Sequence, residues 1–184
     1  MLNSILRKFI RDKNLIEPVE FVIKVSLVYF IWRCLKYLGE TYPGFLWGGW
    51  SWFYDFIGNL LANCDAAILS VLGYKFVHQG RNIVVEGARG IYFSDLCLGI
   101  APLFIFSGII LLFGNNHKAK VWFIPMGLIL IFWINVFRLL ALILIQVHHK
   151  EYFQFAHEYL YVAVTYGIIF LMVIWWMNKL AFKK

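Results

Sequence analysis

Residues 121–147 read VWFIPMGLILIFWINVFRLLALILIQV, an apolar run that contains a single charged residue, Arg138. An α-helix rises about 1.5 Å per residue, so this run can cross the roughly 30 Å hydrocarbon core of a bilayer with some tilt or overhang. Similar apolar blocks occupy about 98–114 and 159–178. These three stretches predict the last three helices of a membrane protein.

The composition points the same way. The chain of 184 residues is 62% hydrophobic and 15% charged, whereas soluble domains hold roughly 45–50% apolar and about 25% charged residues. With a net charge of +7, an anionic bilayer surface is the expected partner rather than nucleic acid. The three scattered cysteines lack CxxC spacing, which argues against a disulfide framework or a zinc site. We expect one membrane domain over residues 1–184, with no metal or cofactor.

The chain before residue 74 is less regular. Residues 1–17 place apolar side chains on one helical face and basic ones elsewhere, which predicts a basic amphipathic lead-in on an anionic leaflet; a solvated tail is the alternative. A first spanning helix is expected at about 18–38, weakened by its three basic side chains. Residues 50–73 carry two aspartates and two asparagines, and we expect a short interfacial or re-entrant helix pair there.

Residues 74–96 change character, with alternating and β-branched runs separated by glycine-containing turns. This pattern predicts a small β-meander. The fold class expected is therefore an all-α, multi-pass transmembrane bundle of about four to six helices. The β-meander precedes Cys97 and lies outside the bilayer.

The positive-inside rule sets the expected orientation. The basic N-terminus, the loop 115–120 and the lysine-bearing tail 179–184 all belong on the cytoplasmic side. The meander, Cys97 and the loop 148–158 then lie at the outer face, which requires an odd number of crossings before residue 74.

In this topology three reactive side chains approach one another at the outer face. Cys97 begins the helix at about 98–114, and His157 opens the last helix. Arg138 lies about nine residues, or ~14 Å, below the outer end of its helix, and its long side chain can reach upward. A histidine can deprotonate a thiol and later protonate a leaving amine, and an arginine can stabilise an oxyanion. The triple predicts acyl transfer through a thioester.

Each residue also has a simpler interpretation. A lone cysteine in an apolar protein is usually a small packing residue. Arg138 could form a structural pair with one of three acidic residues, and two other histidines compete with His157. The acids are Asp55, Asp65 and Asp95, and the histidines are His148 and His149.

The order of these features resembles the exosortase/archaeosortase family of membrane cysteine transpeptidases. The resemblance covers roughly residues 60–175 and is carried by AAILSVLGYKF…NIVV, SDLCLGI, NVFRLLALIL and HEYLYVAVTYGIIF. It implies that Cys97 is the nucleophile, Arg138 the substrate or oxyanion stabiliser, and His157 the acid/base. Many members have Ala-Cys-Ser-Gly at the nucleophile, and the Cys-Leu-Gly form here is similar to that of compact bacterial members.

The resemblance also implies the substrates and the location. The substrates would be exported proteins with a C-terminal sorting signal, made of a short motif, a transmembrane helix and a basic tail. The enzyme would lie in the bacterial cytoplasmic (inner) membrane with both termini in the cytoplasm. The acceptor would be water or an unknown amine. The alternative is a non-enzymatic assembly or transporter subunit in which Arg138 binds an anionic ligand or partner.

Overall fold

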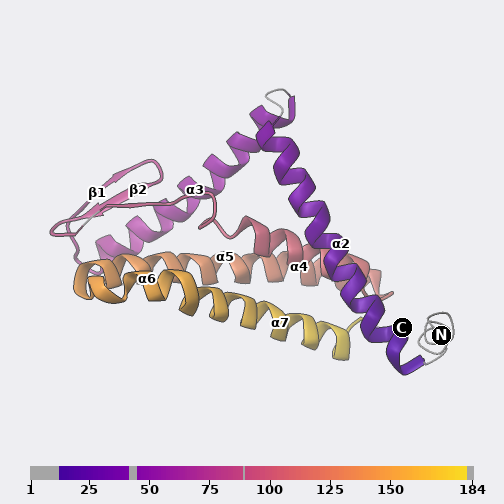
Figure 1. Ribbon diagram of the computed structural model, residues 1–184. Helices are drawn as coiled ribbons and strands as arrows, with labels where there is room; N and C mark the ends of the chain where they lie inside the picture. The colour runs from indigo at the N-terminus through magenta and orange to yellow at the C-terminus, as the bar shows by residue number, and fades with distance from the viewer. Residues whose placement is uncertain (1–12, 42–44, 89, 182–184) are drawn as a thin grey trace, which may run out of the picture.

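The computed structural model describes residues 13–41, 45–88 and 90–181 of the chain (Figure 1). The helices longer than one or two turns are α2 (Lys13–Thr41), α3 (Phe45–Val71), α4 (Ile100–Leu112), α5 (His117–His148) and α7 (Tyr161–Lys179). The strands are β1 (Phe76–Gln79), β2 (Asn82–Val85) and β3 (Ile91–Tyr92). Three short pieces join α5 to α7: the 3₁₀ turn η1 (Lys150–Tyr152), α6 (Phe153–Phe155) and the π-helical segment η2 (Ala156–Leu160).

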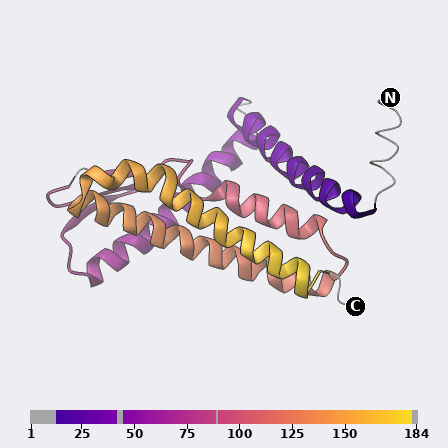
Figure 2. The same cartoon turned by 60° about the horizontal axis from the view of Figure 1, so that its bottom comes forward.

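Helices α5 and α7 run antiparallel and side by side, and α4 packs against both (Figures 1 and 2). Helices α2 and α3 form a V whose first arm contacts α4 and whose second arm contacts α5. The sheet lies at the end of α5 that carries α6, whereas the start of α2 and the end of α7 lie at the other end. The chain thus travels the length of the molecule before it forms the sheet.

Among the described helices, two are long and apolar enough to cross a membrane: His117–His148, and the continuous helical stretch Lys150–Lys179. Helix α4 is also apolar but shorter. Helix α2 falls outside this class, so the crossing expected at 18–38 stays a prediction. Large apolar side chains such as Phe30 and Leu171 are 64% exposed, which suits contact with lipid rather than water. Of the lead-in expected at 1–17, residues 1–12 lie outside the described residues, and 13–17 begin α2.

The prediction of a helix pair at 50–73 is wrong, because α3 is one continuous helix of 27 residues. Its polar residues Asp55, Asn59 and Asn63 are spaced by four and share one face, where they line a surface hollow. Asp65 is off this stripe and is fully buried. The polar side chains therefore mark one face of a helix and do not interrupt it.

The segment 74–96 contains the expected strands, as an antiparallel sheet in the order β1-β2-β3. A two-residue turn, Gly80-Arg81, joins β1 to β2, with Gly80 at a φ of 59° that glycine adopts at little cost. Ile83 and Val85 point inward and are 1% and 3% exposed, in a core shared with α3 and α5. The position of this sheet outside a bilayer stays a prediction.

Packing between α4 and α5 provides a test of this architecture. A Cβ added to Gly127 on α5 would lie 2.3 Å from the buried ring of Phe106 on α4, whereas one added to Gly167 on α7 meets nothing within 4 Å. We expect Gly127→Ala to destabilise the folded protein by about 1–3 kcal/mol, the usual range for an overpacked core. Thermal unfolding in detergent should show a lower midpoint for Gly127→Ala and a wild-type midpoint for the control Gly167→Ala. Equal midpoints for the two variants would contradict this packing.

Candidate functional site

Cys97 lies in a tight turn between β3 and α4. The backbone N–H of Cys97 donates to the carbonyl of Ser94 at 2.8 Å. Gly99 then adopts a left-handed φ of 71° as the residue before the helix, which begins at Ile100. The expectation that Cys97 begins the helix is therefore wrong, because the left-handed Gly99 separates the two. The thiol is presented by a turn.

The imidazole of His157 faces this thiol. Its Nε2 lies 3.4 Å from Sγ of Cys97, and the hydroxyl of Ser94 donates to the same sulfur at 3.3 Å. Cys97 is 8% exposed and His157 is half-buried. Two groups separated by 60 residues are thus brought into hydrogen-bond reach of each other, the arrangement that a thiol nucleophile and its base require.

The sequence predicted that His157 opens the last helix. In the structure it lies instead within the π-helical η2, after η1 and α6. The ring of Phe153, one turn earlier, stacks on the imidazole with centroids 5.9 Å apart. His148 accepts or donates a hydrogen bond with the Tyr74 hydroxyl at 2.8 Å, and His149 lies 3.8 Å from Glu151. Of these three histidines, only His157 contacts the thiol.

Asn135 holds the Cys97 turn from the side of α5. Its Nδ2 donates to the carbonyl of Cys97 at 3.1 Å, and the side chain is 2% exposed. A Cβ on Gly99 would lie 3.1 Å from this amide, so glycine is favoured there by both its φ and the close approach. Sequence reasoning left Asn135 without a role, although an amide in the middle of an apolar run, three residues before Arg138, was a signal.

No hydrogen bond or ion pair joins Arg138 to Cys97 or His157 among the described residues. Arg138 does not line the cavity at Cys97, and its buried Nε has no hydrogen-bond partner among the described residues. Arg138 follows Asn135 by three residues, which places the two on one face of α5.

Arg138 does not pair with any of the acidic residues considered for it. Asp55 and Asp95 both bind Arg81, a residue that sequence reasoning missed. The carboxylate oxygens of the buried Asp65 have no hydrogen-bond partner in the described part of the chain. Burial lowers the pKa of Arg81, but the hydrogen bond and charge of Asp95 outweigh that effect, so its pKa is raised and it stays charged.

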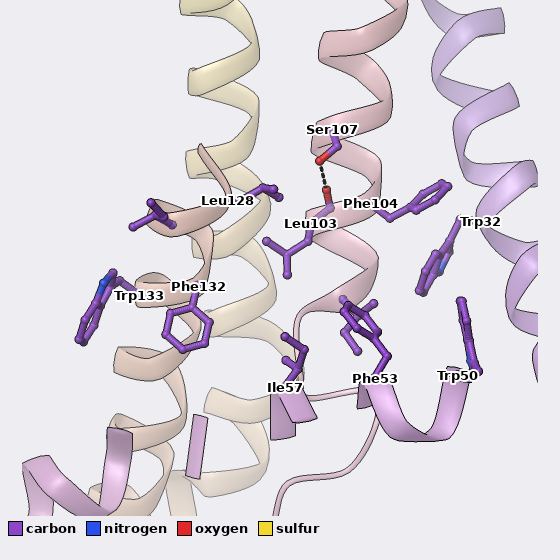
Figure 3. A pocket seen from close by; sticks show the side chains of 12 residues that line it. Trp32, Trp50, Phe53, Ile57, Leu103, Phe104, Ser107, Leu128, Phe132 and Trp133 are labelled. Atoms are coloured by element: carbon purple, nitrogen blue, oxygen red, sulfur yellow. Dashed lines mark hydrogen bonds between the residues drawn. The ribbon is translucent and has the colours of Figure 1, made fainter. Parts of the chain in front are cut away.

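Two cavities lie near the Cys97 turn. The smaller, about 260 Å³, is bordered by β3, by Ser94, Cys97 and His157, and by apolar residues of α5. The larger, about 620 Å³, lies between α2, α3, α4 and α5 and is lined by aromatic and aliphatic side chains (Figure 3). Among the described residues that line it, Ser107 carries the one hydroxyl, which donates to the Leu103 carbonyl at 2.8 Å. The smaller cavity is therefore the one equipped for chemistry.

The sequence model of a family described as transmembrane exosortase (Exosortase_EpsH) matches residues 21–177. The chain belongs to this exosortase family. No curated protein and no solved structure matched the chain. Membership in this family confirms the resemblance found in the sequence. This exosortase is therefore a membrane protein, and its family takes part in the processing of sorting signals.

The exosortase geometry predicts how the thiol reacts. An unassisted thiol is only a few per cent thiolate at neutral pH, and His157 is placed to accept its proton. In a background of Cys34→Ser and Cys64→Ser, we expect His157→Ala to slow alkylation of Cys97 by iodoacetamide at pH 7 roughly tenfold. Mass spectrometry of the labelled protein measures the rate, and His148→Ala is the matched control. A rate unchanged by His157→Ala would show that this imidazole does not assist the thiol.

Proposed function

We propose that this exosortase is a membrane-embedded cysteine protease and transpeptidase that cleaves C-terminal sorting signals of exported proteins. The observation that carries the proposal is the contact between Sγ of Cys97 and Nε2 of His157 at 3.4 Å, beside a cavity that both residues and Ser94 line. Family membership supports the choice of this chemistry over packing as the role of the thiol.

The proposed reaction has two halves. His157 takes the thiol proton as Sγ attacks the carbonyl carbon of the peptide bond, and the imidazolium then gives that proton to the leaving amine as the C–N bond breaks. The result is a thioester on Cys97 and a released C-terminal segment. In the second half, water or an acceptor amine attacks the thioester, His157 removes its proton, and the thiol is regenerated.

Arg138 is proposed to act on the substrate and not on the thiol. Its guanidinium has no ion-pair partner among the described residues, and the group lies one helical turn from the residue that holds Cys97. An arginine without a partner in an apolar environment is costly, which favours a functional role. The negative charge that develops on the carbonyl oxygen, or a carboxylate of the substrate, would supply the missing partner.

The cavity fits an extended peptide. Within the described part of the chain, strand β3 pairs with β2 on one side only. Both of its residues, Ile91 and Tyr92, line the cavity beside Cys97. A free strand edge is a common place for a peptide to bind in extended form. The transmembrane helix of the substrate would lie alongside the enzyme in the bilayer. In this proposal the enzyme crosses the bacterial inner membrane several times and carries its active site at the outer face.

The alternative is a membrane subunit without enzymatic activity that binds an anionic ligand through Arg138. The same unpartnered guanidinium favours it. The two functions separate at Cys97, because a binding protein would need Arg138 and not the thiol.

The deciding experiment compares C-termini of surface proteins in cells that express the wild type or Cys97→Ala. We expect Cys97→Ala to abolish processing and leave full-length substrates in the membrane, because no thioester can form. Mass spectrometry of C-terminal peptides provides the readout. Cys34→Ala and Cys64→Ala are matched controls that should process normally, since neither thiol contacts a histidine in the described chain. Normal processing by Cys97→Ala, combined with its loss in Arg138→Met, would support the binding protein instead.

A further inference from the structure

Arg81 is the most heavily hydrogen-bonded side chain near the site, and the proposed reaction does not use it. It occupies the second position of the β1–β2 turn, and its side chain is 9% exposed. Its Nε and one terminal nitrogen donate to the carbonyl of Phe93, at 2.9 Å and 2.5 Å. The same terminal nitrogen donates to Asp95, and the other donates to Asp55 at 3.2 Å. One guanidinium therefore satisfies three acceptors.

The acceptors bracket the residue that contacts the thiol. Phe93 and Asp95 flank Ser94, whose carbonyl accepts from the backbone of Cys97 and whose hydroxyl donates to its sulfur. The attachment is reinforced in the backbone, because the N–H of Phe93 donates to the carbonyl of Arg81 at 2.9 Å. A change in the position of Arg81 would thus shift the start of the turn that presents Cys97.

The opposite end of the guanidinium is fixed to α3. Asp55 of α3 accepts one bond, and Gly58 of α3 leaves room for the arginine side chain, since a Cβ there would lie 2.6 Å from Nε of Arg81. Asn135 holds the other end of the Cys97 turn from α5. The turn is therefore held on both sides. Arg81 binds the residues before the thiol, and the amide of Asn135 binds the carbonyl of Cys97 itself.

We propose that Arg81 is a positioning residue that sets the place of the Cys97 thiol relative to His157 by clamping Phe93 and Asp95 to α3. The inference rests on the proposed function for its consequence, because positioning matters only if the thiol reacts. Arginine suits the task because its planar fork of donors can bond several acceptors at once, whereas the ammonium of lysine acts as a point charge.

The sharpest test uses two glycines of the same helix. Gly58→Ala adds a methyl group against Arg81, whereas Gly49→Ala, also in α3, adds one where nothing lies within 4 Å. Alanine is the better helix former at both sites, so helix propensity does not separate the variants. We expect Gly58→Ala to slow both alkylation of Cys97 at pH 7 and substrate turnover, roughly tenfold to a hundredfold, because a misplacement of about 1 Å can cost on the order of a hundredfold in rate. Gly49→Ala should match the wild type.

The pH profile of alkylation separates a loss of assistance to the thiol from a loss of access to it. With the Cys34→Ser and Cys64→Ser background, a displaced thiol that the reagent still reaches should react slowly at pH 7 but at the wild-type rate at pH 10, where a thiol of ordinary pKa ionises without help. A thiol that the reagent can no longer reach would react slowly at both pH values, and thermal unfolding in detergent shows whether each variant remains folded. If Gly58→Ala unfolds the protein, Asp95→Asn replaces it, since this change keeps the shape of the side chain and removes the ion pair with Arg81.

Variants of the arginine itself complete the test. Arg81→Met should slow the alkylation of Cys97 at pH 7. Arg81→Lys should restore only part of the rate, because one ammonium cannot reach all three acceptors. Arg33→Met, at an exposed arginine of α2, is the control. Wild-type rates at pH 7 for folded Gly58→Ala, Asp95→Asn and Arg81→Met would overturn the proposal. If those variants lose reactivity while Cys97→Ala cells still process substrates, the clamp stands and the proposed function fails.

Discussion

The hydrogen bond from Asn135 to the carbonyl of Cys97 is the link on which the site depends. It joins a long apolar helix to an irregular turn, and it is buried where water cannot replace it. An unpaired backbone carbonyl in such surroundings is costly. The Asn135 amide therefore gives this carbonyl its hydrogen bond and also fixes the turn. Gly99 leaves room for the amide. The direction of α4 and the place of the thiol both follow from this contact.

Much of the fold could be predicted from residue patterns. The apolar runs define α4, α5 and α7, and the glycines at 80 and 87 separate the strands because both adopt positive φ values. The choice of Cys97 and His157 rested on their order in the chain and on a common membrane face. The two residues lie close together because α5 and α7 run antiparallel, so that the chain after α5 turns back toward the Cys97 turn.

The features that could not be predicted depend on contacts between residues that lie far apart in the sequence. Arg81 binds acids 26 residues before it and 14 residues after it, and no local pattern links such positions. The polar residues of α3 suggested an interrupted helix, but the spacing of Asp55, Asn59 and Asn63 by four places them on one face of a continuous helix. The π-helical turn at His157 has no sequence signature of its own, and it moves the imidazole away from the start of the helix.

Helix α4 has 13 residues, which makes it about 20 Å long and therefore about 10 Å shorter than the hydrocarbon core of a bilayer. If Leu112 marks one boundary of that core, the Cys97 turn would lie inside the opposite boundary and not on the membrane surface. The scissile bond would then have to leave the hydrated layer before it is cut. At such a depth water is a scarce reactant, so the fate of the acyl group would depend on which nucleophile can follow the substrate into the lipid.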